Sequence, residues 1–221
     1  MHPMSKDEKK PAGRTYSGLS QEQRKSMRRQ QFLDAGLEVF GTVGFRAATV
    51  RRLCREAKLT DRYFYEAFGS LEKLLIAVYE YHMGKLRQRI VQAVSDTKPG
   101  TDMLTITHTA LNCYFAELED PRVARVCMVE LEGISPEVDI LYNGYITGFA
   151  ELILWFVQRV HPNWELSEAE FQVLGISLVG AMRQAATNWL LSDYHIDRKT
   201  MVEVTSKIFI GLMNLIETEQ S

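Results

Sequence analysis

The stretch from residue 44 to residue 74 constrains the fold of this chain more than any other. Thr49 has a side chain that can cap a helix, and Thr60 offers the same signal further on. Between them, apolar residues recur at helical spacing, namely Val50, Leu53, Cys54 and Ala57. Residues 57–59 then leave room only for a tight turn. Two short helices joined in this way predict a helix-turn-helix, a motif that places its second helix in the major groove of DNA.

The charges of the chain separate along its length. The whole chain carries a net charge of −2, but residues 1–90 hold 18 Lys and Arg against 10 Asp and Glu, a net of +8. Residues 91–221 hold 8 basic and 18 acidic residues, a net of −10. A basic N-terminal part joined to an acidic body is typical of a protein whose one end meets phosphate.

Helix-start signals recur through the rest of the chain. They comprise capping boxes at residues 20–23 and 167–170, and capping side chains at Ser70, Asp102, Asp120, Ser135 and Asp197. The helix that follows Asp120 is expected to run to Gly133. No sustained alternation of apolar and polar residues indicates a strand, so we predict an all-α fold.

Three parts of the chain follow from these signals. We expect a flexible basic arm over residues 1–19, which could lie against DNA or be only a tail, and a three-helix DNA-binding domain over residues 20–69. Residues 70–221 are expected to form a long connecting helix and a further helical domain, to which the family resemblance described below assigns ligand binding and dimerisation.

The composition excludes several classes of protein. The chain is 46% hydrophobic and 24% charged, so it can bury a core. It has no run of about eighteen apolar residues and no apolar signal region near its start, so we expect neither a membrane span nor secretion. Three widely spaced cysteines without a CxxC motif suit a reducing cytoplasm, and no motif indicates a cofactor or a metal site.

Residues 29–76 resemble the DNA-binding domain of the TetR family of bacterial transcriptional regulators. The resemblance is carried by LDAGLEVFGTVGFRAATVRRLCREAKLTDRYFYEAFGSLEKLL, which begins at residue 33. It implies an all-helical homodimer, usually a repressor, whose C-terminal domain binds a small molecule that lowers DNA affinity. The chain departs from the family at Lys58, where the turn usually holds glycine, and at Leu71, where a lysine often touches phosphate. Arg62-Tyr63 also replaces a small pair.

The helix-turn-helix offers two kinds of DNA contact. Candidates for phosphate contact are Thr49, Arg51, Arg52, Lys73 and, by the family resemblance, Tyr65. In the second helix, which Thr60 caps, Arg62 can grip a guanine edge and Asp61 can accept from cytosine. Tyr63 can pack on a thymine methyl group or donate to a phosphate.

The acidic body is expected to hold an effector pocket and a dimer interface. An apolar or aromatic small molecule is the expected effector, in a pocket formed by Tyr114, Cys127, Met128, Glu130, Tyr145, Phe149, Phe156 and Arg183. The dimer interface is expected at Leu174, Leu178, Met182, Ala185, Trp189, Ile208, Leu212 and Leu215, in a four-helix bundle of two helices from each subunit. Effector binding would shift the connecting helix, residues 70–92, and release the protein from a palindromic operator.

Two other hypotheses remain open at this point. Cys113 and Cys127 lie in neighbouring helices and could pair, which would make the protein a redox-sensing regulator. A helical enzyme or metal-binding protein is the less favoured alternative, because GxSxG, P-loop and HExxH motifs are absent. His108 and Glu117 could still meet a metal through tertiary contact.

Phosphate neutralisation makes a prediction about salt. The affinity of the protein for double-stranded DNA should fall steeply between about 50 and about 200 mM salt, because bound cationic side chains release counterions. Gel-shift titrations at the two salt concentrations measure this. Equal binding at both would exclude phosphate neutralisation by this surface.

Overall fold

A computed structural model describes residues 20–98, 100–160 and 163–219, and the arm predicted for residues 1–19 lies outside them. The described residues form helices and no strands, which confirms the all-α prediction. The helices are α1 (Gln21–Val43), α2 (Val50–Ala57), α3 (Asp61–Ala67), α4 (Leu71–Ser95), α5 (Met103–Glu117), α6 (Pro121–Met128), α7 (Pro136–Val160), α8 (Glu168–Leu191) and α9 (Arg198–Glu219), with a 3₁₀ turn η1 (Phe45–Ala47) after α1.

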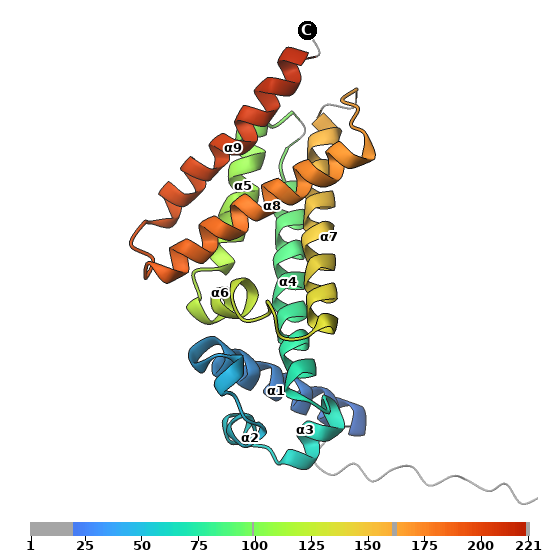
Figure 1. Ribbon diagram of the computed structural model, residues 1–221, viewed down its shortest axis with the longest axis vertical. Helices are drawn as coiled ribbons and strands as arrows, with labels where there is room; N and C mark the ends of the chain where they lie inside the picture. The colour runs from blue at the N-terminus through green and yellow to red at the C-terminus, as the bar shows by residue number, and fades with distance from the viewer. Residues whose placement is uncertain (1–19, 99, 161–162, 220–221) are drawn as a thin grey trace, which may run out of the picture.

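The helices are arranged as a small head and a larger body (Figure 1). We call α1–α3 the head and α4–α9 the body. The head lies at one end of the molecule, and α4 rises from it into the body, where it runs beside α5 and α7. The short helix α6 lies between the head and the rest of the body, against α1.

Most predicted helix starts are confirmed at the level of single hydrogen bonds. Ser20 and Ser167 each form a capping box, with Gln23 and Glu170 respectively. The Thr49 hydroxyl accepts from the backbone N–H of Arg52 and so caps α2. The predicted helices therefore begin where local hydrogen bonding places them.

The turn between α2 and α3 is left-handed at a residue that is not glycine. Lys58 has φ 55° and ψ 37°, and its backbone N–H bonds to the carbonyls of Arg55 and Cys54. A β-carbon in this conformation costs about 1 kcal/mol. The tight turn of the helix-turn-helix is thus retained at that cost.

The prediction that the helix after Asp120 runs to Gly133 was wrong. Helix α6 ends at Met128, and the backbone N–H groups of Val129 and Glu130 both bond back to the carbonyl of Arg125. The chain turns there because Leu131, only 1% exposed, joins the core, while Glu130 faces the head.

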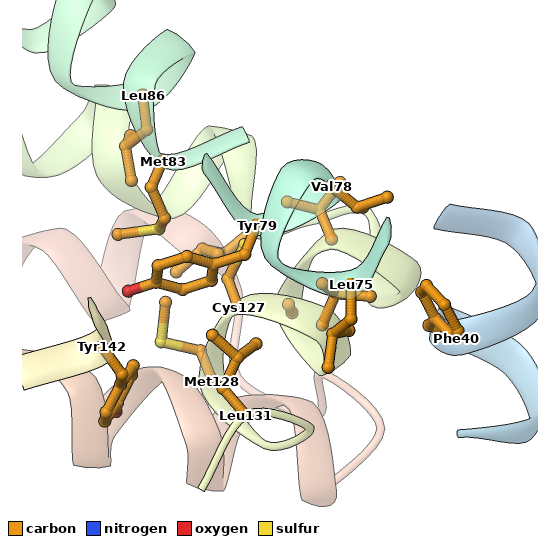
Figure 2. Close-up of a cluster of buried hydrophobic side chains, with 14 of the residues drawn as sticks. Phe40, Leu75, Val78, Tyr79, Met83, Leu86, Cys127, Met128, Leu131 and Tyr142 are labelled. Carbon is orange, nitrogen blue, oxygen red and sulfur yellow. The ribbon is translucent and has the colours of Figure 1, made fainter. Parts of the chain in front are cut away.

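Head and body share one hydrophobic core. Figure 2 shows buried side chains of α4 and α6 lying between Phe40 of α1 and Tyr142 of α7. The buried face of α4 includes Leu75, Val78 and Tyr79, each 1% exposed or less. Helix α4 therefore contacts the head and the body through one continuous side, as its apolar spacing predicts.

Among the described residues, only the α7 segment Pro136–Gln158 is long and apolar enough to cross a membrane, by length and composition alone. This segment packs against α8 and lines an internal cavity. A core helix passes the same test, so the finding is weak evidence for a membrane.

The contact between α1 and α6 yields a stability prediction. A β-carbon on Gly41 would lie 2.4 Å from Cβ and 2.6 Å from Cα of Arg122. Gly41→Ala should therefore lower the free energy of unfolding by about 1–3 kcal/mol, measured by urea denaturation. The matched control is Gly84→Ala in α4, where nothing lies within 4 Å of the new β-carbon. This control should stabilise by about 0.5–1 kcal/mol, and equal losses at both glycines would contradict the explanation.

Candidate DNA-binding surface and ligand cavity

Helix α3 presents a polar surface to solvent. Thr60, Asp61, Arg62 and Tyr65 are all exposed, whereas Phe64 is fully buried against the head core. The Asp61 carboxylate accepts from the backbone N–H of Arg62 at 2.8 Å, and Thr60 occupies the cap position without a capping bond from its hydroxyl. The exposed side of α3 thus holds the side chains predicted to contact bases.

Tyr63 differs from its neighbours because it is half-buried. The guanidinium of Arg28 in α1 lies 4.4 Å from the centre of the Tyr63 ring. One face of the ring is therefore covered by a cation, which attracts its π system. Tyr63 packs α3 against α1. Its predicted contact with DNA must therefore use the hydroxyl or the part of the ring that Arg28 does not cover.

Arg28 is a candidate DNA-contacting residue that the sequence analysis missed. It lies in the N-terminal half of α1 with Arg24, Lys25 and Arg29, and its position over Tyr63 brings this basic segment beside α3. Its spacing of four residues from Arg24 could have been noticed as a basic helical face.

The phosphate candidates lie around α3. Thr49 and Arg51 are exposed and Arg52 is half-buried at the start of α2, while Lys73 is exposed in the first turn of α4. Both helix starts also offer backbone N–H groups, which favour anions. Leu71 packs against the core, so Lys73 is the cation that the first turn of α4 itself offers.

A cavity of about 140 Å³ lies inside the body between α4, α5, α6, α7, α8 and α9. Seven of the eight predicted pocket residues line it, namely Tyr114, Cys127, Met128, Tyr145, Phe149, Phe156 and Arg183. The sequence analysis missed the contributions of α4 and α9, namely Tyr79, Met83, Ile90, Val94, Phe209 and Met213. The spacing of the α4 residues had identified that helix as buried, but spacing cannot separate a cavity wall from packed core.

Glu130, the eighth predicted pocket residue, lies elsewhere. Its Oε2 accepts from the backbone N–H of Phe45 at 2.7 Å, and its Oε1 accepts from Nε of Arg125 at 2.8 Å. Arg125 also donates to the carbonyl of Thr42. Because α6 ends at Met128 and does not continue to Gly133, Glu130 faces the head. Its carboxylate bonds the end of α1 to the body.

The glycine at the end of α1 is required by this contact. Gly44 has φ 83°, which disfavours any residue with a β-carbon. A β-carbon there would also lie 3.0 Å from Oε1 of Glu130. We name the group formed by Thr42, Gly44, Phe45, Arg125 and Glu130 the α1–α6 latch.

The cavity wall is polar near α6. Arg183 donates through Nη2 to the carbonyl of Met128 at 3.0 Å and pairs with Glu132 at 2.8 Å. Burial raises the pKa values of the Tyr79 and Tyr114 hydroxyls above their ordinary range. Both hydroxyls therefore stay protonated at neutral pH, and the Tyr114 hydroxyl donates to the carbonyl of Met182 at 3.4 Å.

The predicted dimer surface needs correction for three residues. Leu178, Met182 and Trp189 are 3–6% exposed and belong to the core of their own subunit. Leu174, Ala185 and Leu212 are half-buried, whereas Ile208 and Leu215 are exposed.

The exposed apolar residues of α8 and α9 also include Val173, Ile176, Leu191 and Val204, between 49% and 70% exposed. Large apolar side chains exposed on α8 and α9 are typical of a surface that a partner covers, and the dimer interface on these helices stays a prediction.

The cysteines do not favour redox sensing. Burial raises the pKa of the Cys127 thiol and, more modestly, that of Cys113 and Cys54. A protonated thiol is a poor nucleophile, so burial makes these thiols less reactive than exposed ones.

The described residues contain no group of three or more His, Cys, Asp or Glu side chains that could hold a metal ion. The two residues considered for a metal have other partners. His108 bonds to Ser206 at 3.0 Å, whereas Glu117 pairs with Lys85 and Arg89.

Comparison with known proteins identifies the family. Residues 32–78 match the family model described as "Bacterial regulatory proteins, tetR family". The chain is 24% identical over 217 residues to the HTH-type transcriptional activator FasR of Mycolicibacterium smegmatis, covering 97% of this chain and 94% of that protein. It is 21% identical over 169 residues to the Fatty acid metabolism regulator protein of Bacillus subtilis, covering 76% and 86%.

A solved structure has the same fold. It is the transcriptional regulator FadR from Bacillus subtilis in complex with stearoyl-CoA, with a TM-score of 0.68 and 18% identity, covering 85% of this chain and 96% of that one. The family match lies in the N-terminal part of the chain, which is therefore a TetR-type DNA-binding domain, and the chain as a whole is similar to bacterial transcriptional regulators.

Two arginines of the head should respond differently to substitution. Arg62→Ala should weaken binding to the preferred DNA sequence by about 1–3 kcal/mol and relax specificity, because a base contact is lost. Arg51→Ala should weaken binding to all sequences nearly equally. Anisotropy titrations with preferred and scrambled duplexes measure both. A uniform loss from Arg62→Ala would contradict its assignment to a base.

The dimer surface generates a second prediction. Ile208→Lys should shift the protein towards monomer in analytical ultracentrifugation, because a buried lysine without a partner is costly. Ile140→Lys, at a 75% exposed position on α7, is the matched control and should leave the mass unchanged. An unchanged mass for Ile208→Lys would remove this side of α9 from the interface.

Proposed function

We propose that this protein is a cytoplasmic homodimer that binds a palindromic operator and is released by a long-chain acyl effector. It acts as a repressor wherever the operator overlaps a promoter. The observation that carries the proposal is the position of α6, which forms part of the cavity wall on one side and docks the head on the other.

An acyl chain fits the chemistry of the cavity. Nearly all the lining side chains are apolar, which favours a hydrocarbon over a polar occupant. The related FadR structure was solved with stearoyl-CoA, which supports this class of effector. The proposal of an acyl chain is more specific than the sequence-based expectation, which was an apolar or aromatic small molecule.

A structural change caused by the effector can be transmitted to the head through α6. Cys127 and Met128 line the cavity, while Arg122 and Arg125 of the same helix contact Glu38 and Thr42 of α1. An occupant that displaces Met128 must also displace the turn that carries Glu130. The α1–α6 latch then moves the end of α1, and with it the head.

Helix α4 provides the second route, which the sequence analysis expected. Tyr79 and Met83 line the cavity one to two turns away from Leu75, which packs near Phe40 of α1. Movement along either route changes the separation of the two α3 helices in the dimer. They must sit about 34–36 Å apart to enter successive major grooves, so a small change disfavours DNA binding.

The experiment uses DNA selected from a random pool by the full-length protein. Stearoyl-CoA should release this DNA, which raises the apparent Kd for DNA measured by fluorescence anisotropy. The Glu130→Gln variant should bind stearoyl-CoA as the wild type does, because Glu130 does not touch the cavity. The rise in its apparent Kd for DNA should be about tenfold smaller than that of the wild type, within the range of typical couplings.

The control for this variant is Glu137→Gln, an exposed carboxylate in the first turn of α7. It should behave as the wild type. Full release of the Glu130→Gln variant would exclude the α1–α6 latch as the route. No effect of stearoyl-CoA on the wild type would exclude the acyl effector itself.

A further inference from the structure

The two ends of the cavity differ in polarity. At the α6 end the lining includes Arg183, Tyr79 and Tyr114. At the opposite end it is formed by Val94, Met103, Val157 and Met213, the last two of which belong to a separate apolar cluster. Thr107 is the one polar side chain on that part of α5 among the described lining residues. A ligand with one polar end is therefore oriented by the cavity itself.

Arg183 has hydrogen-bonding capacity that the described residues do not use. Its Nη2 is occupied by the Met128 carbonyl and Glu132, but its Nε is buried and has no partner among the described residues. The guanidinium carbon lies 5.3 Å from the centre of the Tyr142 ring, and the buried Tyr142 hydroxyl also lacks a partner there. Buried donors without acceptors are costly, so the Nε–H of Arg183, a residue that lines the cavity, calls for an acceptor there.

The charges at this end favour an oxygen acceptor. The described lining contains no Asp, Glu or Lys. The carboxylate paired with Arg183 is Glu132, whose side chain is 58% exposed, so solvent screens much of its charge. The Tyr114 hydroxyl already donates to the carbonyl of Met182 at 3.4 Å, so the donor left at this end is the Nε–H of Arg183. An ammonium group would face the cationic guanidinium here, whereas a carbonyl or carboxylate oxygen would accept from its Nε–H.

We propose that Arg183 binds the acyl oxygen of the effector, with the carbonyl at the α6 end and the hydrocarbon tail directed towards Met103, Val157 and Met213. The inference rests on the proposed acyl effector and adds its orientation and the residue that recognises its polar end. Arg183 also bonds to the carbonyl of Met128, the last residue of α6. The residue that recognises the acyl oxygen therefore touches the helix that docks the head.

The test compares two ligands that differ only at the acyl oxygen. Stearoyl-CoA carries the carbonyl, whereas its thioether analogue S-octadecyl-CoA has the same chain length and no carbonyl. By isothermal titration calorimetry the wild type should prefer stearoyl-CoA by roughly ten- to a hundredfold, the range for a hydrogen bond to a charged group. Arg183→Met should lose this preference while binding the thioether as the wild type does. Stearate, tested separately, shows whether a free carboxylate is accepted as well as a thioester.

Two further variants separate recognition from folding. Arg183→Lys keeps a charged donor and should retain part of the preference. Glu137→Gln, which changes an exposed carboxylate in the first turn of α7, is the control and should leave both affinities unchanged. Thermal unfolding of each variant establishes that it is folded before titration.

Several results would overturn the inference. If Arg183→Met weakened both ligands equally, Arg183 would have only a structural role. A wild type that bound both ligands without preference would show that no group recognises the oxygen. Either result leaves the acyl effector standing, whereas a wild type that bound neither ligand nor stearate would overturn the effector class as well.

Discussion

The packing of α6 against α1 is the contact on which the rest of this structure depends. Gly41 allows the two helices to approach until the backbone of Arg122 occupies the place of a side chain. Around this point Arg122 pairs with Glu38, and the α1–α6 latch closes over the end of α1. Because packed interiors resist compression, a helix held this closely moves together with its neighbour.

This contact explains why a small head can respond to events in a larger body. Helices α2 and α3 have few residues and draw their stability from the core they share with α1 and α4. The same core continues through Tyr79 to the cavity wall (Figure 2). In the proposed function, recognition of DNA and binding of an effector use opposite ends of one packed unit, which is joined by polar contacts at α6 and apolar contacts at α4.

The sequence predicted the helices well because their ends are encoded locally. Ser20, Thr49 and Ser167 each cap the helix expected of them, since the capping bond spans only three residues. The end of α6 was missed for the opposite reason. Glu130 turns towards Phe45, a partner 85 positions away in the chain, and no local pattern indicates such a contact.

The sequence by itself determined the all-α class, the helix-turn-helix and the basic surface around α3, because helical spacing, caps and net charge are properties of short segments. Only the tertiary structure decided which apolar residues face inward. In α8, Trp189 is 3% exposed while Leu191, two residues on, is 70% exposed. The two side chains lie on opposite sides of the helix, and which side is covered is defined only once α6, α7 and the Phe115 ring of α5 have packed against α8. The same packing places the donors of Arg183 at one end of the cavity, where their chemistry can act on a ligand.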